Sequence, residues 1–145
     1  MTGWLLDTNM LSAFGPGKRP LAAETVGWFQ ARADALHLSI ITVAEIESGI
    51  AKLRRTGSEH RAENLRVWFD RILETYGERV LAFDIDAARI AGILDDAARA
   101  AGRHPGFPDV AIASIAKMHE FVVLTVNLRH FQPLGVDAVN PLSLN

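Results

Sequence analysis

The feature that most constrains the fold is an alternation of short apolar runs with longer amphipathic stretches along the 145 residues. Such alternation is typical of strand–helix units built around a parallel sheet. The expected strands are Trp4–Leu6, Leu36–Ile41, Val80–Phe83, Phe121–Val126 and, at an edge, Val136–Val139. No internal repeat or linker interrupts the pattern. We therefore predict one α/β domain over residues 1–145.

The amphipathic stretches between these runs predict helices. The side chains of Leu65, Trp68, Phe69, Ile72 and Leu73 recur at helical spacing and form one core-facing stripe. The segment Asp109–His119 is apolar on most sides, so we expect it to be buried. The expected helices are a short one starting at Leu11–Phe14, then Leu21–Arg32, Thr42–Arg55, Ser58–Tyr76, Ala87–Ala101 and Asp109–His119.

Composition narrows the class of protein. The chain has no cysteine, which excludes disulfides and thiolate zinc sites. It has no signal-like N-terminal segment, and no apolar run approaches the roughly 18 residues of a membrane span. These features predict a soluble cytoplasmic protein. The net charge of −2 argues against strong non-specific binding of nucleic acid by the whole surface, but it leaves local basic patches open.

Side chains with polar oxygens follow the ends of the expected strands. Asp7 comes directly after the first strand, Glu45 lies after the second and Asn127 follows the fourth. Asp109 opens the helix that precedes the fourth strand. Open α/β sheets bind ligands beyond the carboxyl ends of their strands. Oxygen ligands without histidine or cysteine suit Mg²⁺ or Mn²⁺, so we predict such a site with Asp7 and Asp109 as direct ligands.

Each of these residues also has a purely structural interpretation. Asp7 and Asp109 fit turn or helix-capping positions, and Asn127 fits a turn. Thr42 and Glu45 have the spacing of a capping box, with Thr42 as the N-cap residue. Asp109 differs because its helix has almost no polar face. An unpaired charge there would be unfavourable, and a bound cation would remove that penalty.

Binding of RNA phosphates requires positive charge, which is concentrated between residues 52 and 71. This segment contains six basic residues and three acidic ones. The expected substrate contacts are Lys52, Arg54 and Arg55, with Lys18 and Arg19 as further candidates. The alternative is an ordinary solvated helix face.

Four segments resemble, in order, the motifs of PIN-domain proteins. They are Leu5–Asn9, Leu38–Ile50, Gly102–Ala113 with its Pro108-Asp109 step, and Leu124–Phe131. The likeness covers nearly the whole chain, to Val139-Asn140-Pro141, and is greatest to the VapC and FitB toxins of bacterial toxin–antitoxin pairs.

This resemblance implies a parallel sheet of four to five strands with helices on both faces. It also implies a Mg²⁺- or Mn²⁺-dependent endoribonuclease that acts on RNA, a cognate antitoxin that blocks the site, and a homodimer. The apolar content around Leu65, Trp68 and Phe69 exceeds what one small core needs and favours the dimer independently. Mapped by motif, the catalytic residues are Asp7, Glu45, Asp109 and Asn127.

We expect Glu45 to bind a metal-bound water or a second ion, and Thr8 and Thr125 to orient water. The fourth position is often aspartate in the family, and Asn127 brings no charge. Three carboxylates neutralise one divalent ion fully, so we expect a second ion to bind more weakly.

Three other functions stay open. Asp7 after a first strand also fits an aspartyl-phosphate phosphatase, although such enzymes generally have a second acid where Asn9 stands. A phosphate-accepting signalling domain fits less well, because it needs paired acids and a late lysine. The third alternative is a non-catalytic RNA- or protein-binding module with a decayed acidic site, which Asn127 would explain.

Overall fold

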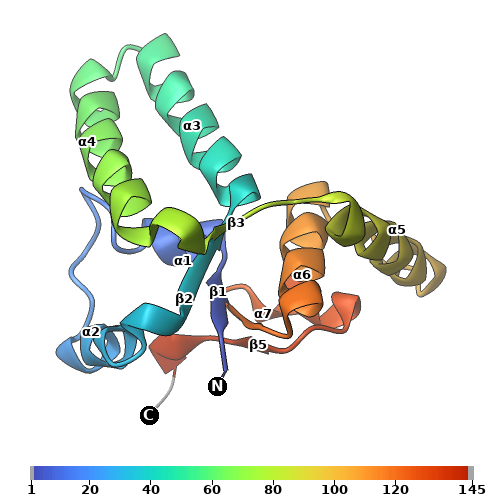
Figure 1. Cartoon of the computed structure of the whole chain (residues 1–145). Coiled ribbons are helices and arrows are strands. Elements are labelled where there is room, and N and C mark those ends of the chain that lie inside the picture. Colours follow the sequence, from blue (N-terminus) through green and yellow to red (C-terminus); the bar gives the residue numbers. More distant parts are fainter. Residues whose placement is uncertain (1, 144–145) are drawn as a thin grey trace.

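The computed structural model describes residues 2–143, which form a five-stranded parallel sheet. The strands are β1 (Trp4–Leu6), β2 (Leu36–Ser39), β3 (Val80–Leu81), β4 (Val122–Leu124) and β5 (Ala138–Val139). Their order across the sheet is β3-β2-β1-β4-β5, so β1 is central and β5 lies at an edge (Figure 1). The predicted α/β class and the edge position of the last strand are confirmed.

Helices connect the strands. They are α1 (Thr8–Ser12), α2 (Ala23–Gln30), α3 (Ile40–Arg55), α4 (Glu59–Tyr76), α5 (Ile85–Ala100), α6 (Phe107–His119) and α7 (Leu128–Phe131). The sequence pattern missed α7, which is too short to show a helical period. It also began α6 two residues late. Gly106 is the N-cap and Pro108 lies in the first turn, where the missing N–H of proline is tolerated. No helix within residues 2–143 is long and apolar enough to cross a membrane.

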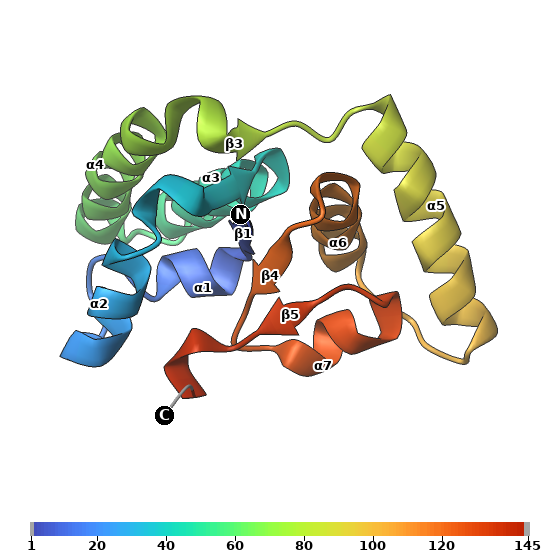
Figure 2. The same ribbon diagram turned by 60° about the horizontal axis from the view of Figure 1, so that its bottom comes forward.

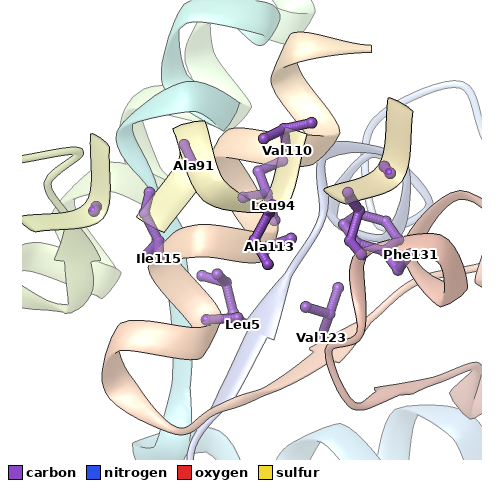
Figure 3. Close-up of a cluster of buried hydrophobic side chains, with 13 residues drawn as sticks. Leu5, Ala91, Leu94, Val110, Ala113, Ile115, Val123 and Phe131 are labelled. Atoms are coloured by element: carbon purple, nitrogen blue, oxygen red, sulfur yellow. The ribbon is translucent and has the colours of Figure 1, made fainter. Parts of the chain in front are cut away.

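The central strand separates two hydrophobic cores because successive side chains of a strand point to opposite faces. Leu5 packs among buried side chains of α5, α6 and α7 (Figure 3). Leu6 packs in the other core, with side chains of α1, α2, α3 and α4. Figure 2 shows these two groups of helices on either side of the strands. Helix α6 is buried from Val110 to Ala116, as its apolar sequence predicts.

The stripe on α4 faces the chain's own core. Phe69 is fully buried, and Leu65 and Trp68 pack partly buried against the same cluster. These side chains therefore provide no apolar surplus for a dimer, and that reason for expecting one was wrong. Large apolar side chains are exposed elsewhere instead, at Ile85 (72%) and Ile93 (70%), among others.

Candidate active site

Asp7 lies at the carboxyl end of β1, in the middle of the sheet. Its backbone N–H donates to the carbonyl oxygen of Leu124 at 3.0 Å, which places it beside the end of β4. The residue is 4% exposed. Its Oδ1 accepts from the Met10 N–H at 2.7 Å and caps α1, while its Oδ2 accepts from the Thr125 hydroxyl at 2.5 Å. The prediction that Asp7 caps a helix is thus correct, but the cap occupies only one of the two carboxylate oxygens.

The surroundings of Asp7 disfavour its negative charge. Burial raises the pKa of the Asp7 carboxyl above 3.8, and the hydrogen bonds from Thr125 and Met10 offset part of this rise. The carboxylates of Asp109 and Glu45 raise the pKa of Asp7 further. Three acids that are distant in sequence therefore act on one another through space, as the prediction of a shared acidic site requires.

Glu45 does not belong to a capping box, and that interpretation was wrong. Helix α3 begins at Ile40, because Ser39 is its N-cap and accepts from the Thr42 N–H at 3.2 Å. Glu45 therefore lies in the second turn, where its carboxylate has no capping role. Its Oε1 accepts from the Thr8 hydroxyl at 2.5 Å, and the Thr8 and Thr42 hydroxyl oxygens are 3.0 Å apart. A chain of hydroxyl groups thus fixes Glu45 near the end of β1.

Asp109 is the third residue of α6, where the helix dipole favours a carboxylate. Its Oδ2 is 3.3 Å from Nδ1 of His130 on α7, and its side chain is 29% exposed. Burial raises the pKa of Asp109, the neighbouring His130 lowers it and the Glu45 carboxylate raises it. Asp109 is thus half-buried, as expected, with a histidine as its neighbour.

Asn127 is the N-cap residue just before α7, and its side chain makes no capping hydrogen bond. Its backbone N–H donates to the Thr125 hydroxyl oxygen at 2.9 Å. Because that hydroxyl donates in turn to Asp7, Thr125 connects the ends of β1 and β4. The hydroxyls of Thr125 and Thr8 are therefore donors to carboxylates, whereas the sequence led us to expect them to orient water.

Two hollows open on either side of these acids. The first, which we call the α3/α4 cleft, has a volume of about 560 Å³ and is lined by Thr8, Glu45, Lys18 and Arg61, among others. The second, which we call the α6/α7 pocket, has a volume of about 260 Å³, and Asp109 is one of its walls. Open space thus reaches the carboxylate cluster at Glu45 and at Asp109.

The donor set suits a hard cation with an incomplete protein shell. Among residues 2–143, no three His, Asp or Glu side chains are close enough to form a ready-made metal cage. Mg²⁺ keeps several waters and is commonly held by one or two carboxylates together with substrate phosphates. A carboxylate whose pKa is raised mainly by burial, and further by two acidic neighbours, fits that pattern. A histidine-rich zinc site does not fit these residues.

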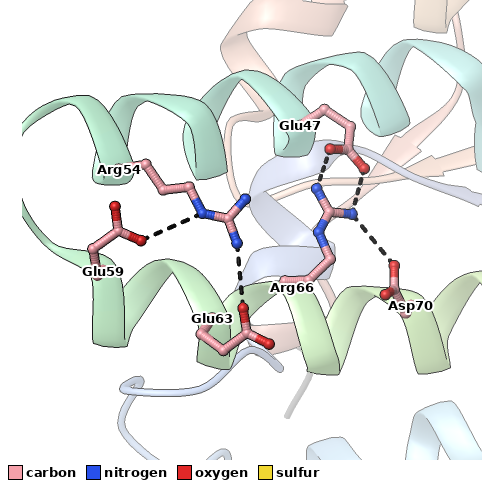
Figure 4. Close-up of polar contacts among 6 residues, drawn as sticks. All are labelled: Glu47, Arg54, Glu59, Glu63, Arg66 and Asp70. Carbon is pink, nitrogen blue, oxygen red and sulfur yellow. Dashed lines mark hydrogen bonds and ion pairs between the residues drawn. The ribbon is translucent and has the colours of Figure 1, made fainter.

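The basic segment 52–71 is only partly free to bind phosphate. Arg54 pairs with Glu59 (3.6 Å) and Glu63 (3.2 Å), and Arg66 pairs with Glu47 and Asp70 (Figure 4). Lys52, Arg54 and Arg55 lie in the last turn of α3, and Arg55 is about 15 Å along the helix from Glu45. The cations that line the α3/α4 cleft are Lys18 and Arg61.

Sequence reasoning missed three residues beside Asp109. Arg103, Arg129 and His130 line the α6/α7 pocket. They lie within the motif-like segments Gly102–Ala113 and Leu124–Phe131, which was the available signal. His130 is more than a surface or packing residue, because its Nδ1 contacts the Asp109 carboxylate.

Comparison with known proteins agrees with this arrangement. The PIN domain family model matches residues 4–133. Plasmid stability protein StbB of Pseudomonas syringae is 37% identical, and VapC ribonuclease Y4jK of Sinorhizobium fredii is 34% identical; each match covers 94% of this chain and 96% of the relative. The crystal structure of FitAcB from Neisseria gonorrhoeae is similar with a TM-score of 0.83 and 30% identity, over 97% of this chain and 99% of that one. The chain therefore belongs to the PIN-domain family and is of the VapC/FitB type.

Proposed function

We propose that this protein is an endoribonuclease, the toxin of a toxin–antitoxin pair, which hydrolyses RNA phosphodiester bonds with the help of Mg²⁺ or Mn²⁺. The observation that carries the proposal is the buried Asp7 carboxylate, which Asp109 and Glu45 influence electrostatically at the carboxyl edge of the sheet. The relatives named VapC ribonuclease and toxin FitB support both the activity and the role.

Asp7 and Asp109 would hold the cation, and Glu45 would bind one of its waters or a second ion. A bound Mg²⁺ or Mn²⁺ supplies an activated water and neutralises charge on the phosphate and the leaving oxygen. Asn127 offers only a neutral oxygen, so the three carboxylates leave a second ion weakly supported.

Thr125 and Thr8 act on the carboxylates. Each hydroxyl donates a hydrogen bond to an acid, Thr125 to Asp7 and Thr8 to Glu45, both at 2.5 Å. Such a bond fixes the rotation of the carboxylate and leaves further lone pairs on its oxygens for a cation. We propose that both threonines orient ligands, which limits the motion of the acids before substrate binds.

Cleavage of single-stranded RNA by the purified protein tests the proposal. Asp7→Asn should reduce the rate by more than about 100-fold, because loss of a group that merely supports a metal ligand already costs 10–100-fold. Asp84→Asn is the matched control. Asp84 also follows a strand and caps a helix, through the Ala87 N–H at 2.9 Å, but it lies outside the site.

Three outcomes would contradict the proposal. If Asp7→Asn and Asp84→Asn cleave RNA at the same rate, Asp7 has no role in catalysis. Cleavage that persists in EDTA would exclude the divalent cation. RNA binding without cleavage in the wild-type protein would favour the non-catalytic binding module.

We also propose a cognate antitoxin and action in the cytoplasm, where RNA is available. The relative named toxin FitB supports this role. A short open reading frame next to the gene, when co-expressed, should co-purify with the protein and suppress RNA cleavage. Co-purification without inhibition would argue against an antitoxin that blocks the site.

We propose a homodimer, supported by exposed apolar side chains on α5 and α6. Ile85 and Ile93 are more than two-thirds exposed, and Phe107 is 63% exposed with its ring packed edge-on against Phe83. Light scattering at micromolar concentration should give twice the monomer mass, and Ile93→Glu should shift it towards the monomer. A monomeric wild-type protein would contradict the proposal.

A further inference from the structure

The α6/α7 pocket is built mainly from basic side chains around one acid. Its walls come from the loop that precedes α6, the first turn of α6, and α7 with the turn that follows. The residues that carry chemistry there are Arg103, His104, Asp109, Arg129 and His130. The pocket therefore has Asp109, a proposed cation ligand, in one wall and basic side chains in the others.

Both arginines of this pocket are free to bind a ligand. Arg103 and Arg129 are exposed and make no ion pair or side-chain hydrogen bond with any residue between positions 2 and 143. Some other arginines are engaged, since Arg99 pairs with Asp95 at 3.0 Å and Arg79 donates to backbone carbonyls. Arg61 of the α3/α4 cleft, in contrast, is unpaired within the described part of the chain, like the two at the pocket. Arg103 and Arg129 therefore belong to the arginines that have no structural role in the fold and can bind a ligand.

The one carboxylate of the pocket does not neutralise these arginines. Asp109 contacts His130, at 3.3 Å, and neither guanidinium group. Two guanidinium groups and one carboxylate leave a local surplus of positive charge on a chain whose net charge is −2. The N-terminal end of α6, which Gly106 caps without a side chain, adds a dipole of the same sign. The pocket therefore attracts an anion.

We propose that the α6/α7 pocket binds a backbone phosphate of the RNA, adjacent to the phosphate that is cut, with Arg103 and Arg129 as its ligands. This rests on the proposed ribonuclease function. Guanidinium groups present a planar fork of donors that matches phosphate oxygens, and both are exposed at the pocket's lining. Asp109 separates this phosphate from the cation site, and His130 holds Asp109 in place between them.

The positions of the two hollows also define a path for the RNA across the protein. One phosphate lies in the α6/α7 pocket, the scissile phosphate lies over Asp7 and Asp109, and the strand continues into the α3/α4 cleft. Lys18 and Arg61 line that cleft and meet the next part of the backbone. Binding through backbone phosphates alone is independent of base sequence.

The test is RNA binding by the wild-type chain, by the double variant Arg103→Ala/Arg129→Ala, and by Lys117→Ala. Lys117 is an exposed cation near the C-terminal end of α6, about 12 Å along the helix from Asp109, so it controls for net charge. The probe is a short single-stranded RNA that the wild-type protein cuts, measured by fluorescence anisotropy in EDTA. The double variant should bind more weakly. The negative slope of log affinity against log salt concentration should become shallower by about 0.7 for one lost phosphate contact.

Single methylphosphonate substitutions in the same RNA locate the contact. Neutralising one phosphate should weaken binding to the wild-type protein and to Lys117→Ala, and should have no further effect on the double variant. The conservative variant Arg103→Lys/Arg129→Lys should retain the salt slope but bind less tightly, because lysine lacks the fork of donors.

The outcomes separate the two levels of proposal. If all variants cut and bind the RNA alike, the proposed phosphate site in the α6/α7 pocket is wrong, but the proposed ribonuclease function is unaffected. If the wild-type protein neither binds nor cuts any RNA, both fall. If the double variant binds RNA normally but loses an acidic antitoxin peptide, the pocket recognises a protein carboxylate and the proposal is overturned. Equal urea midpoints for all variants exclude unfolding as the cause, as expected for exposed arginines.

Discussion

Replacing Thr125 by valine removes one hydroxyl and keeps the shape of the side chain. In the folded protein this hydroxyl is fully buried and donates to Oδ2 of Asp7 at 2.5 Å, while its oxygen accepts from the Asn127 N–H at 2.9 Å. A hydrogen bond to a charged group contributes roughly 1.5–3 kcal/mol. Thr125→Val should therefore lower the free energy of unfolding by about that amount, and the melting temperature by roughly 5–9 °C for a chain of this size.

Urea unfolding in EDTA at pH 7 measures this loss of stability. A double-mutant cycle shows how much of it comes from the hydrogen bond between Thr125 and Asp7. Thr125→Ser, which keeps the hydroxyl, should lose clearly less than the valine variant. In an Asp7→Asn background the carboxylate charge is absent, so Thr125→Val should cost about 1 kcal/mol less than in the wild type. A loss below about 0.5 kcal/mol, or an equal loss in both backgrounds, would show that the hydroxyl does not stabilise the charge on Asp7.

Two further predictions concern stability away from the site. Gly3→Ala should destabilise the fold by about 1–3 kcal/mol in urea, because an added Cβ would lie 2.2 Å from the Phe121 ring; an unchanged midpoint would mean that the ring moves freely. Burial lowers the pKa of His37 below 6.5, so the unfolded chain binds a proton that the folded chain resists. Stability from this residue is present above pH 6.5 and is lost as the pH falls through the lower folded pKa. His37→Gln should weaken that pH dependence, and an identical profile for both proteins would contradict the assignment.

The alternation of apolar and amphipathic segments was enough to predict the sheet, because parallel strands buried on both faces are short apolar runs. It predicted Trp4–Leu6 with the bounds that the structure shows. It failed where local chemistry decides a boundary. Ser39, inside a predicted strand, ends that strand by capping α3, and this also overturned the capping box at Thr42.

The carboxylate cluster was predictable because carboxyl ends of parallel strands meet at one edge, where Asp7 and Glu45 follow their strands. The hydroxyl contacts were not. The bond from Thr125 to Asp7 spans 118 positions in the sequence and depends on the register of β1 with β4. The neighbour of Asp109, His130, likewise becomes visible only once α7, too short to recognise, is folded beside α6.

The most direct test of the account is the location of a divalent cation in crystals soaked with Mn²⁺. Anomalous difference density should show the ion bound to carboxylate oxygens of Asp7 and Asp109, with any second peak, near Glu45, weaker than the first. Soaked crystals of Asp7→Asn should lose the main peak, while those of Asp84→Asn should keep it. A Mn²⁺ ion held by histidines, or no ion at Asp7 and Asp109 at concentrations that support RNA cleavage, would contradict the assignment of these carboxylates as the catalytic centre.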